Sequence, residues 1–596
     1  MTRFARLTCS AALAALCTGA SFAQDEPAAD PRQGLAPGLY DAGEAAKGME
    51  LVHFIPSPEG FNDPAAIMRR SMFEGDEPPA YSPLALANTD LAFADGKVFM
   101  GSYHGFNVYD TTSEGEPAHI ASIVCPGGQG DVAVHGDLLF MSVEQNRGRL
   151  DCGTQGAEGE VNEERFRGIR IFDISDLSNP VQVGAVQTCR GSHTHTLVPH
   201  PSDENILYVY NQGTSAPRTG EELAGCSTGS PDENPETALY SIDIIKVELD
   251  NPAAAAIIDS PRIFADSQTG EIAGLWRGGR MGVRTQRTAS TNHCHDITVY
   301  PEMGIAAGAC SGNGILLDIT DPENPVRLAD TFDPDMAYWH AAIFNNEADA
   351  VVFTDEWGGG VGPMCHADSP EEWGANYIAT IEDGEFVGQS LFKIPNVQTP
   401  EENCVAHNGS LVPVPGRDLF IQSWYQGGLS LIDFTDPANP FEVGFFDRGP
   451  VDAEELTVAG HWSAYWYNGR IYASEIARGL DVLRLSPTDQ LSQAEIAAAE
   501  QVMTAVHNPQ TQEKISWDDT AWVGLSYLDQ LDRAEALESG LSQAARTLLN
   551  RWADGNLSNR SARRVAADIG EAASELEGLD AERAAALAAL LTRAAS

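Results

Sequence analysis

Histidine is the residue type whose placement in this sequence could support chemistry. Five of the 14 histidines recur at one aligned position of an internal repeat, at the start of an apolar segment. Two more lie two residues earlier, which gives two His-x-His pairs. Neutral imidazole is a good ligand for copper, zinc, iron and nickel. We therefore predict a transition-metal cofactor, with copper favoured because the set is rich in nitrogen, and zinc or iron as alternatives. The candidate ligands are His193, His195, His293, His295, His340, His407 and His461.

Two other interpretations of these histidines stay open. A histidine at the start of an inner strand can bond to neighbouring backbone and hold adjacent repeats together. A group of imidazoles can also handle protons or bind an anion without a metal. Three glutamates near the same place could complete a coordination sphere, orient a ring, act as a general base or simply be solvated: Glu144, Glu356 and Glu475. Four tryptophans could line an apolar pocket there or belong to the core: Trp339, Trp357, Trp424 and Trp462.

The elements that must position the histidines belong to an internal repeat. Segments starting at Gly168, Gly314 and Gly428 each contain an alternating apolar strand, an aspartate, an Asn-Pro turn and a second short strand. Proline presets the backbone and Asn or Asp bonds to the local chain, so the pattern predicts a hairpin. We interpret the three aspartates as turn formers rather than catalysts: Asp173, Asp318 and Asp433.

A second hairpin precedes each of these, so the repeating unit has four strands. Such units, repeating at roughly 40–50 residues and lengthened by insertions, are typical of a β-propeller. Seven first strands are expected to begin at residues 89, 130, 195, 295, 340, 407 and 461. The predicted fold class is therefore all-β, a seven-bladed β-propeller. The last unit has three strands, and an N-terminal strand at 49–56 would complete it and close the ring. First strands line the central channel, so histidines at their starts would meet at one mouth.

The pattern resembles the LVIVD-repeat family of exported bacterial β-propeller proteins. The resemblance rests on the three Gly-to-Asn-Pro units and on Met49-Glu50-Leu51-Val52 ahead of the first blade, and it covers roughly residues 48–486. It implies the fold and export. It implies no particular chemistry, because the family is known mainly as a fold.

Composition predicts four parts of the chain. The start is basic, then apolar, and ends in a small-x-small site, which is typical of a secretory signal peptide and of a periplasmic or extracellular protein. The end is Ala-rich with helical spacing, which predicts an α-helical C-terminal appendage. The expected parts are a signal peptide at 1–23, a flexible acidic lead at 24–44, the propeller at 45–486 and the helical domain at 487–596.

The cysteines agree with an oxidising compartment. Of the 10 cysteines, Cys9 and Cys17 fall in the leader, and the even number that remains predicts disulfides. All of these map to the mouth that carries the histidines. The expected pairs would staple insertions over that mouth: Cys125–Cys189, Cys152–Cys226, Cys294–Cys310 and Cys365–Cys404. Ligation of a metal by the Cys310 thiolate is an alternative.

Charge narrows the partners. A formal net charge of -50 repels nucleic acid and acidic membrane surfaces. No stretch beyond the leader has the roughly 18 apolar residues of a membrane span. We expect a monomer that takes a small molecule or a protein at the propeller mouth. Three functions fit: a metal-dependent oxidoreductase acting on a small molecule, a non-enzymatic binding or scaffold propeller, and a metal-dependent hydrolase with a glutamate as base.

Overall fold

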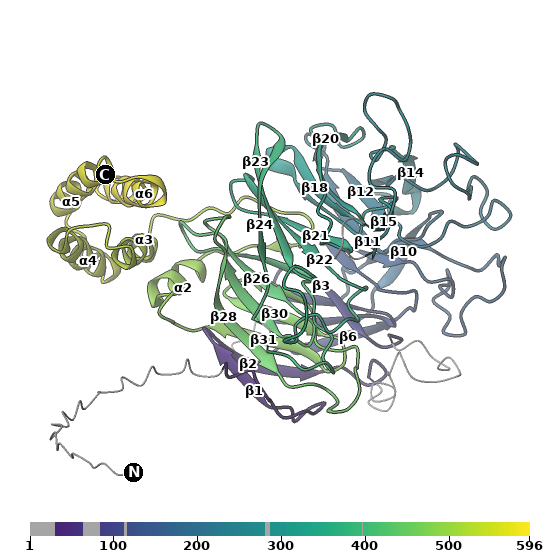
Figure 1. Ribbon diagram of the computed structural model, residues 1–596, viewed down its shortest axis with the longest axis horizontal. Helices are drawn as coiled ribbons and strands as arrows, with labels where there is room; N and C mark the ends of the chain where they lie inside the picture. Colours follow the sequence, from purple (N-terminus) through teal and green to yellow (C-terminus); the bar gives the residue numbers. More distant parts are fainter. Residues whose placement is uncertain (1–29, 63–83, 112–115, 281–286, 396) are drawn as a thin grey trace, which may run out of the picture.

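In the computed structural model, seven antiparallel sheets form the blades of a propeller; five of them have four strands and two have five. Figure 1 shows the propeller with a group of helices beside it. The structure describes residues 30–62, 84–111, 116–280, 287–395 and 397–596, so the predicted signal peptide lies outside the described residues. Apolar side chains alternate along each strand and pack between neighbouring sheets, as with Tyr300, Trp339 and Phe353 between blades four and five. The predicted seven-bladed β-propeller is thus confirmed.

The first strand of each blade lies innermost, where it contacts the first strands of adjacent blades. Blade one consists of β3 (Asn88–Ala94), β4 (Lys97–Ser102), β5 (Gly105–Asp110) and β6 (Ala118–Val124). Blade two consists of β7 (Val132–His135), β8 (Leu138–Val143), β9 (Gly168–Asp173) and β10 (Val181–Gln187). Blade three consists of β11 (Thr194–Pro199), β12 (Ile206–Gln212), β13 (Asp243–Glu248) and β14 (Ala256–Asp259). Blade four consists of β17 (Asp296–Tyr300), β18 (Ile305–Cys310), β19 (Asn313–Asp318) and β20 (Val326–Thr331).

The remaining blades follow the same order, with an insertion hairpin between blades three and four. Blade five consists of β21 (Trp339–Phe344), β22 (Ala350–Asp355), β23 (Asn376–Glu382) and β24 (Glu385–Phe392). Blade six consists of β25 (Gly409–Val412), β26 (Leu419–Ser423), β27 (Leu429–Asp433) and β28 (Phe441–Arg448). Blade seven contains β29 (His461–Tyr467), β30 (Arg470–Glu475) and β31 (Gly479–Leu485). The hairpin consists of β15 (Gly279–Arg280) and β16 (Arg287–Thr288).

N-terminal strands complete the last two blades. Strand β2 (Met49–Pro56) pairs with β31 and supplies the fourth strand of blade seven, as predicted. Strand β1 (Glu44–Lys47) adds a fifth strand to blade six. Of the segment 24–44, expected to be a flexible acidic lead, the described residues from Asp30 onward pack against that blade. Arg32 is buried there, pairing with Glu442 and lying over the ring of Phe445.

The repeat aspartates form turns, as interpreted from the sequence. Asp173 accepts hydrogen bonds from the backbone N–H and the hydroxyl of Ser175, at 2.9 and 2.6 Å. Asp318 and Asp433 make the same pair of bonds to a threonine two residues on. A side chain that bonds to its own turn fixes the hairpin locally, which explains why the motif recurs.

Four disulfides tie the insertions to the blades, a pattern consistent with an exported protein. The predicted Cys294–Cys310 and Cys365–Cys404 bridges are confirmed. The predicted Cys125–Cys189 and Cys152–Cys226 bridges are wrong; the bridges are Cys125–Cys152 and Cys189–Cys226. Cys125 and Cys189 hold equivalent places in adjacent blades and are therefore kept one blade apart. Each insertion instead folds back onto the linker in front of its own blade.

Five helices follow the propeller in the described part of the chain: α2 (Gln493–Ala499), α3 (Ala521–Arg533), α4 (Ser539–Ala553), α5 (Asn559–Ala573) and α6 (Gly578–Ala594). The last four pack on one another around Leu528, Leu549, Ile569 and Leu587, and lie beside the propeller (Figure 1). No helix of the described residues combines the length and apolarity needed to cross a bilayer.

A segment between α2 and α3, residues 504–517, crosses the end of the channel opposite the strand starts. We call it the strap. It includes β32 (Val506–His507), which pairs with the end of β3. Its side chains and backbone bond to the inner strands of successive blades because Asn and Gln can donate and accept at once. The partners are Val134 for Asn508, Leu197 for Thr511, Val299 for Gln510 and Gln512, Phe344 for Gln512, Asn346 for Ile515 and Pro413 for Trp517.

Candidate metal centre

Four of the predicted histidines form a continuous row across blades three to six. The ring centroids of His193 and His295 lie 4.2 Å apart, those of His295 and His340 lie 3.7 Å apart, and those of His340 and His407 lie 4.3 Å apart. Each histidine sits at or just before the start of an inner strand. Because every inner strand starts at the same mouth, one histidine per blade is enough to build the row.

A carboxylate completes the group. Glu356 follows β22, and its two oxygens lie 3.8 Å from His340 Nε2 and 3.8 Å from His407 Nε2. One ligand atom each from His295, His340 and Glu356 lies within 4.8 Å of the other two, and all three residues are buried. This group could bind a metal.

Unpaired nitrogens at this place fit a metal ion. Neither ring nitrogen of His340 has a hydrogen-bond partner among the described residues, although the residue is 1% exposed. Nε2 of His407 is likewise buried and unpaired there. A buried polar atom without a partner costs about 1–3 kcal/mol. A transition-metal ion bound by imidazole nitrogen and carboxylate oxygen would satisfy these atoms.

Burial keeps three imidazoles of the row neutral, which is the state that binds a metal. Burial lowers the pKa of His295 and of His340 far below the ordinary value, and the neighbouring imidazoles lower both pKa values further. It lowers the pKa of His407 to about 3. It also raises the pKa of Glu356 to about 7. The three imidazoles are therefore neutral near neutral pH, and neutral imidazole is the ligand form.

Outer partners orient the rings. Nδ1 of His295 lies 3.0 Å from an oxygen of Asp296, and Nδ1 of His407 bonds to the carbonyl of Trp462. For His407 this leaves Nε2 free for the shared centre, where it lies 3.8 Å from Glu356. Nε2 of His295 faces Nε2 of His193 at 2.5 Å.

His193 differs from the other three in charge. Its Nδ1 lies 2.7 Å from Oε2 of Glu144. Burial lowers the pKa of His193, but the Glu144 carboxylate outweighs burial and the pKa lies above its ordinary value. The same contact lowers the pKa of Glu144 against the effect of its burial. His193 is thus placed to hold a proton beside the row.

The other three predicted ligands lie outside the row. Nδ1 of His195 lies 2.8 Å from the Ser142 hydroxyl, deeper in the channel. His293 contacts the Tyr338 hydroxyl at 3.0 Å. Nε2 of His461 contacts Asp481 at 2.8 Å. His193 and His293 precede the regular strands, so the strand rule that places residues i and i+2 on one side does not apply to the two His-x-His pairs.

Some of the glutamates and tryptophans expected at the site lie there, and others do not. Glu475 bonds to Gly460, Ala477 and Arg478 and holds the chain locally. Trp339 and Trp424 belong to the core, and Trp357 stacks on Trp373. Trp462 contacts His407 at 5.1 Å between ring centroids. Sequence reasoning missed three tyrosines at the site, which no repeat pattern marks: Tyr103, Tyr338 and Tyr425.

A pocket of about 430 Å³ opens onto this cluster. His193, His295 and Glu356 form part of its wall, and Trp462 and Tyr425 form another part. Tyr425 donates a hydrogen bond to Glu356 at 2.6 Å. The volume lies within the usual range for small-molecule sites, about 300–1,000 Å³. The cluster is therefore accessible to a small molecule.

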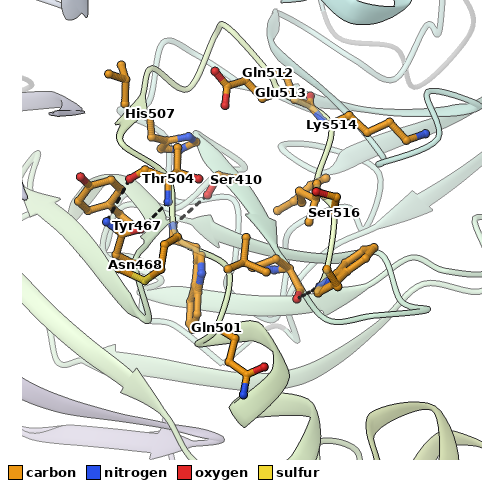
Figure 2. Close-up of a pocket in the computed structure, with 18 of the residues that line it drawn as sticks. Ser410, Tyr467, Asn468, Gln501, Thr504, His507, Gln512, Glu513, Lys514 and Ser516 are labelled. Carbon is orange, nitrogen blue, oxygen red and sulfur yellow. Dashed lines mark hydrogen bonds between the residues drawn. The ribbon is translucent and has the colours of Figure 1, made fainter. Parts of the chain in front are cut away.

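A second cavity, of about 740 Å³, lies between the strap and the ends of blades six and seven (Figure 2). Asn468 bonds to Thr504 on its rim, and Ser410, Gln501 and Lys514 contribute polar groups. None of its lining residues belongs to the histidine row. The two cavities therefore lie at opposite ends of the channel.

We predict that acid destabilises the metal-free protein through these histidines. His407 stays neutral in the fold down to about pH 3, whereas in the unfolded chain it takes up a proton below its ordinary pKa of 6.5. The unfolded state then binds more protons, so stability falls as the pH falls from 6.5 toward 3. Between about pH 7 and pH 5 the loss from one such histidine is about 2 kcal/mol. Urea unfolding of the protein, measured at both pH values in the presence of a metal chelator, should show this loss of stability.

A His407→Gln variant isolates the contribution of His407 to the pH dependence. The raised pKa of Glu356 stabilises the fold as the pH falls, but Glu356 is present in both proteins and its effect is therefore the same in each. The variant should lose about 2 kcal/mol less than the wild type over the same pH range. His119→Gln, at an exposed position on β6, should follow the wild type. Identical pH dependence in all three proteins would contradict the prediction.

Fold and site together define the chain as a seven-bladed β-propeller with a buried His295, His340 and Glu356 group that could bind a metal.

No protein-family model and no curated protein matches this chain. Among solved structures it is similar to BamB from Moraxella catarrhalis, at a TM-score of 0.34 and 10% identity over 74% of this chain and 98% of that chain. It is also similar to Kuenenia stuttgartiensis hydrazine synthase, at a TM-score of 0.41 and 10% identity over 69% and 99%. The Dos1 propeller gives a TM-score of 0.35 and 10% identity over 67% and 78%. Similarities of this size say nothing about function.

Proposed function

We propose that this chain is an exported metal-dependent oxidoreductase that acts on a small molecule at the histidine-lined mouth. Copper is the favoured metal, and iron or zinc are the alternatives. The observation that carries the proposal is His340, which is buried with both ring nitrogens unpaired and lies between His295 and His407. The four disulfides and the basic, apolar leader in the sequence support export.

Each residue of the cluster has a role in this proposal. His295, His340, His407 and Glu356 would hold the ion. When bound, copper supplies one-electron exchange with a substrate in the pocket. His193, which Glu144 keeps prone to protonation, gives a proton to the bound molecule or takes one from it. Trp462 and Tyr425 exclude water from the inner wall.

A metal-dependent hydrolase is the second candidate. Glu356 favours it, because a carboxylate with a pKa of about 7 that faces a pocket suits a general base. Zinc, rather than copper, would then be the expected ion. A binding or scaffold propeller remains the alternative if no metal is found.

Elemental analysis of the exported full-length protein tests the proposal. We expect close to one copper ion per chain, with a paramagnetic signal that ascorbate removes and air restores. We also expect the N-terminus of the exported protein to be Gln24, after removal of the signal peptide. His119→Ala should have the same metal content as the wild type. Zinc without a paramagnetic signal would favour the hydrolase. A protein that stays metal-free after incubation with copper, zinc and iron would overturn both enzyme proposals.

A further inference from the structure

The pocket above the metal centre contains two polar side chains that no part of the described protein satisfies. Gln129 precedes β7, is 1% exposed, and its Oε1 has no hydrogen-bond partner among the described residues. Arg287, on the β15–β16 hairpin, is exposed. Among the described residues it forms neither a hydrogen bond nor an ion pair. A buried amide oxygen normally has a hydrogen-bond partner, so the unpaired Oε1 of Gln129 points to a ligand in the pocket. The exposed guanidinium of Arg287 is available to the same ligand.

Arg287 is the informative residue because of its setting. The chain has a net charge of -50, yet among the described residues that line this pocket Arg287 is the one arginine or lysine, and His193 is prone to protonation as well. Arg280 lies directly opposite it in the hairpin, which adds positive charge at the same rim. Glu356, the carboxylic acid of the described wall, accepts a hydrogen bond from Tyr425 and faces the histidines. A planar guanidinium without a partner is suited to a carboxylate.

The remaining wall is aromatic and apolar. Tyr103 and Trp462 meet edge to face with centroids 6.3 Å apart, and Tyr425 meets Trp462 in the same way at 6.2 Å. Tyr338 and Val361 lie on the wall as well. Aromatic walls bind aromatic rings by offset and edge-to-face contacts.

Two glycines in the loop after β22 leave part of the pocket wall without side chains. Gly358 and Gly359 line the pocket with φ of 70° and 69°, and the space beside each is open. Glycine takes these angles without strain, and it leaves no side chain between a ligand and the loop after β22. The pocket wall beside these two glycines is therefore free of side chains.

We propose that the pocket binds a small aromatic carboxylate that also carries a hydrogen-bond donor, such as a phenolic acid. The carboxylate pairs with Arg287, the ring lies against Trp462 and the tyrosines, and the donor bonds to Gln129. The inference rests on the proposed function in taking this pocket as the substrate site. The aromatic acid is then the substrate class of the oxidoreductase.

Calorimetric titration of the full-length protein tests the inference without an activity assay. The probes are p-hydroxybenzoate, its neutral counterpart p-hydroxybenzamide, and benzoate. We expect p-hydroxybenzoate to bind at least about tenfold more tightly than either of the other two. Arg287→Gln should abolish the preference over the amide and leave amide binding within about twofold. Gln129→Met should abolish the preference over benzoate.

The control is Arg277→Gln, which removes the same charge from the same insertion but does not line the pocket. It should bind all three probes as the wild type does. Equal affinity for acid and amide in the wild type, or a preference that Arg287→Gln leaves intact, would overturn the inference. Metal content is measured on the same samples. Arg287-dependent binding without metal would refute the oxidoreductase alone, and metal that depends on His340 without such binding would refute the aromatic acid alone.

Discussion

Replacing His340 with alanine is expected to lower metal affinity by at least about 100-fold, the largest effect of any single substitution at the site. His340 lies between His295 and His407 in the ring row, and its Nε2 also faces Glu356 at 3.8 Å. Loss of an orienting partner alone costs about 10–100-fold in metal affinity. Loss of a central ligand should cost more. Competition with a chromophoric chelator, followed by elemental analysis, measures the change.

Two matched variants make the measurement specific. His461→Ala removes another predicted ligand, one that contacts Asp481 outside the row, and should retain the metal. His119→Ala removes an exposed histidine and should be silent. If His340→Ala binds metal as tightly as these controls do, the ring row is not a metal centre. The histidines would then serve only to hold the blades together.

Replacing Glu495 with alanine should destabilise the protein by about 3–5 kcal/mol. Glu495, on α2, is fully buried and bonds to Arg417 at 3.0 Å and to Arg533 at 2.6 Å. Burial raises its pKa, but the two arginines outweigh burial and the net pKa is lowered. Its carboxylate also accepts from the N–H of Ser492 and completes the helix cap. Without it, Arg533 loses this partner and Arg417 keeps Asp433 as its remaining carboxylate, so urea unfolding should begin at lower concentration.

Glu500 provides the matched control. It lies at the end of the same helix, but its contact with Arg470 is 3.7 Å long and both side chains are about 40% exposed. A surface pair of this kind contributes about 0–1 kcal/mol, so Glu500→Ala should be nearly neutral. Equal losses in the two variants would show that Glu495 does not join α2 to blade six and α3.

The fold was predictable because its determinants are local and repeated. A turn such as the one at Asp173 depends on a side chain two residues away, so each copy signals itself in the sequence. The closing strand β2 was predictable for a related reason, since blade seven lacked one strand. The strap left no comparable signal. Asn508 and Gln512 bond to strand backbones 374 and 168 residues earlier, and no periodic pattern encodes such contacts.

The site was predictable only in part, because alignment places a residue along a strand but does not aim its side chain. His295, His340 and His407 share a repeat position and form the row with His193. His195 holds the same repeat position, but it bonds to Ser142 in the channel. The difference arises from packing between blades, which depends on neighbours far away in sequence. Two of the four predicted cysteine pairs were wrong for the same reason, because equal offsets in two blades do not imply proximity.

The strap has a kinetic consequence for whatever reaction takes place at the mouth. It bonds to strand ends from blade one to blade six, and Gln510 of the strap donates a hydrogen bond to the buried Asp90 at 3.2 Å. Within the described residues, the strap therefore covers the end of the channel away from the pocket. If the pocket is the substrate site proposed above, product leaves through the mouth by which substrate enters, and the two compete for one site. Product inhibition should then be competitive.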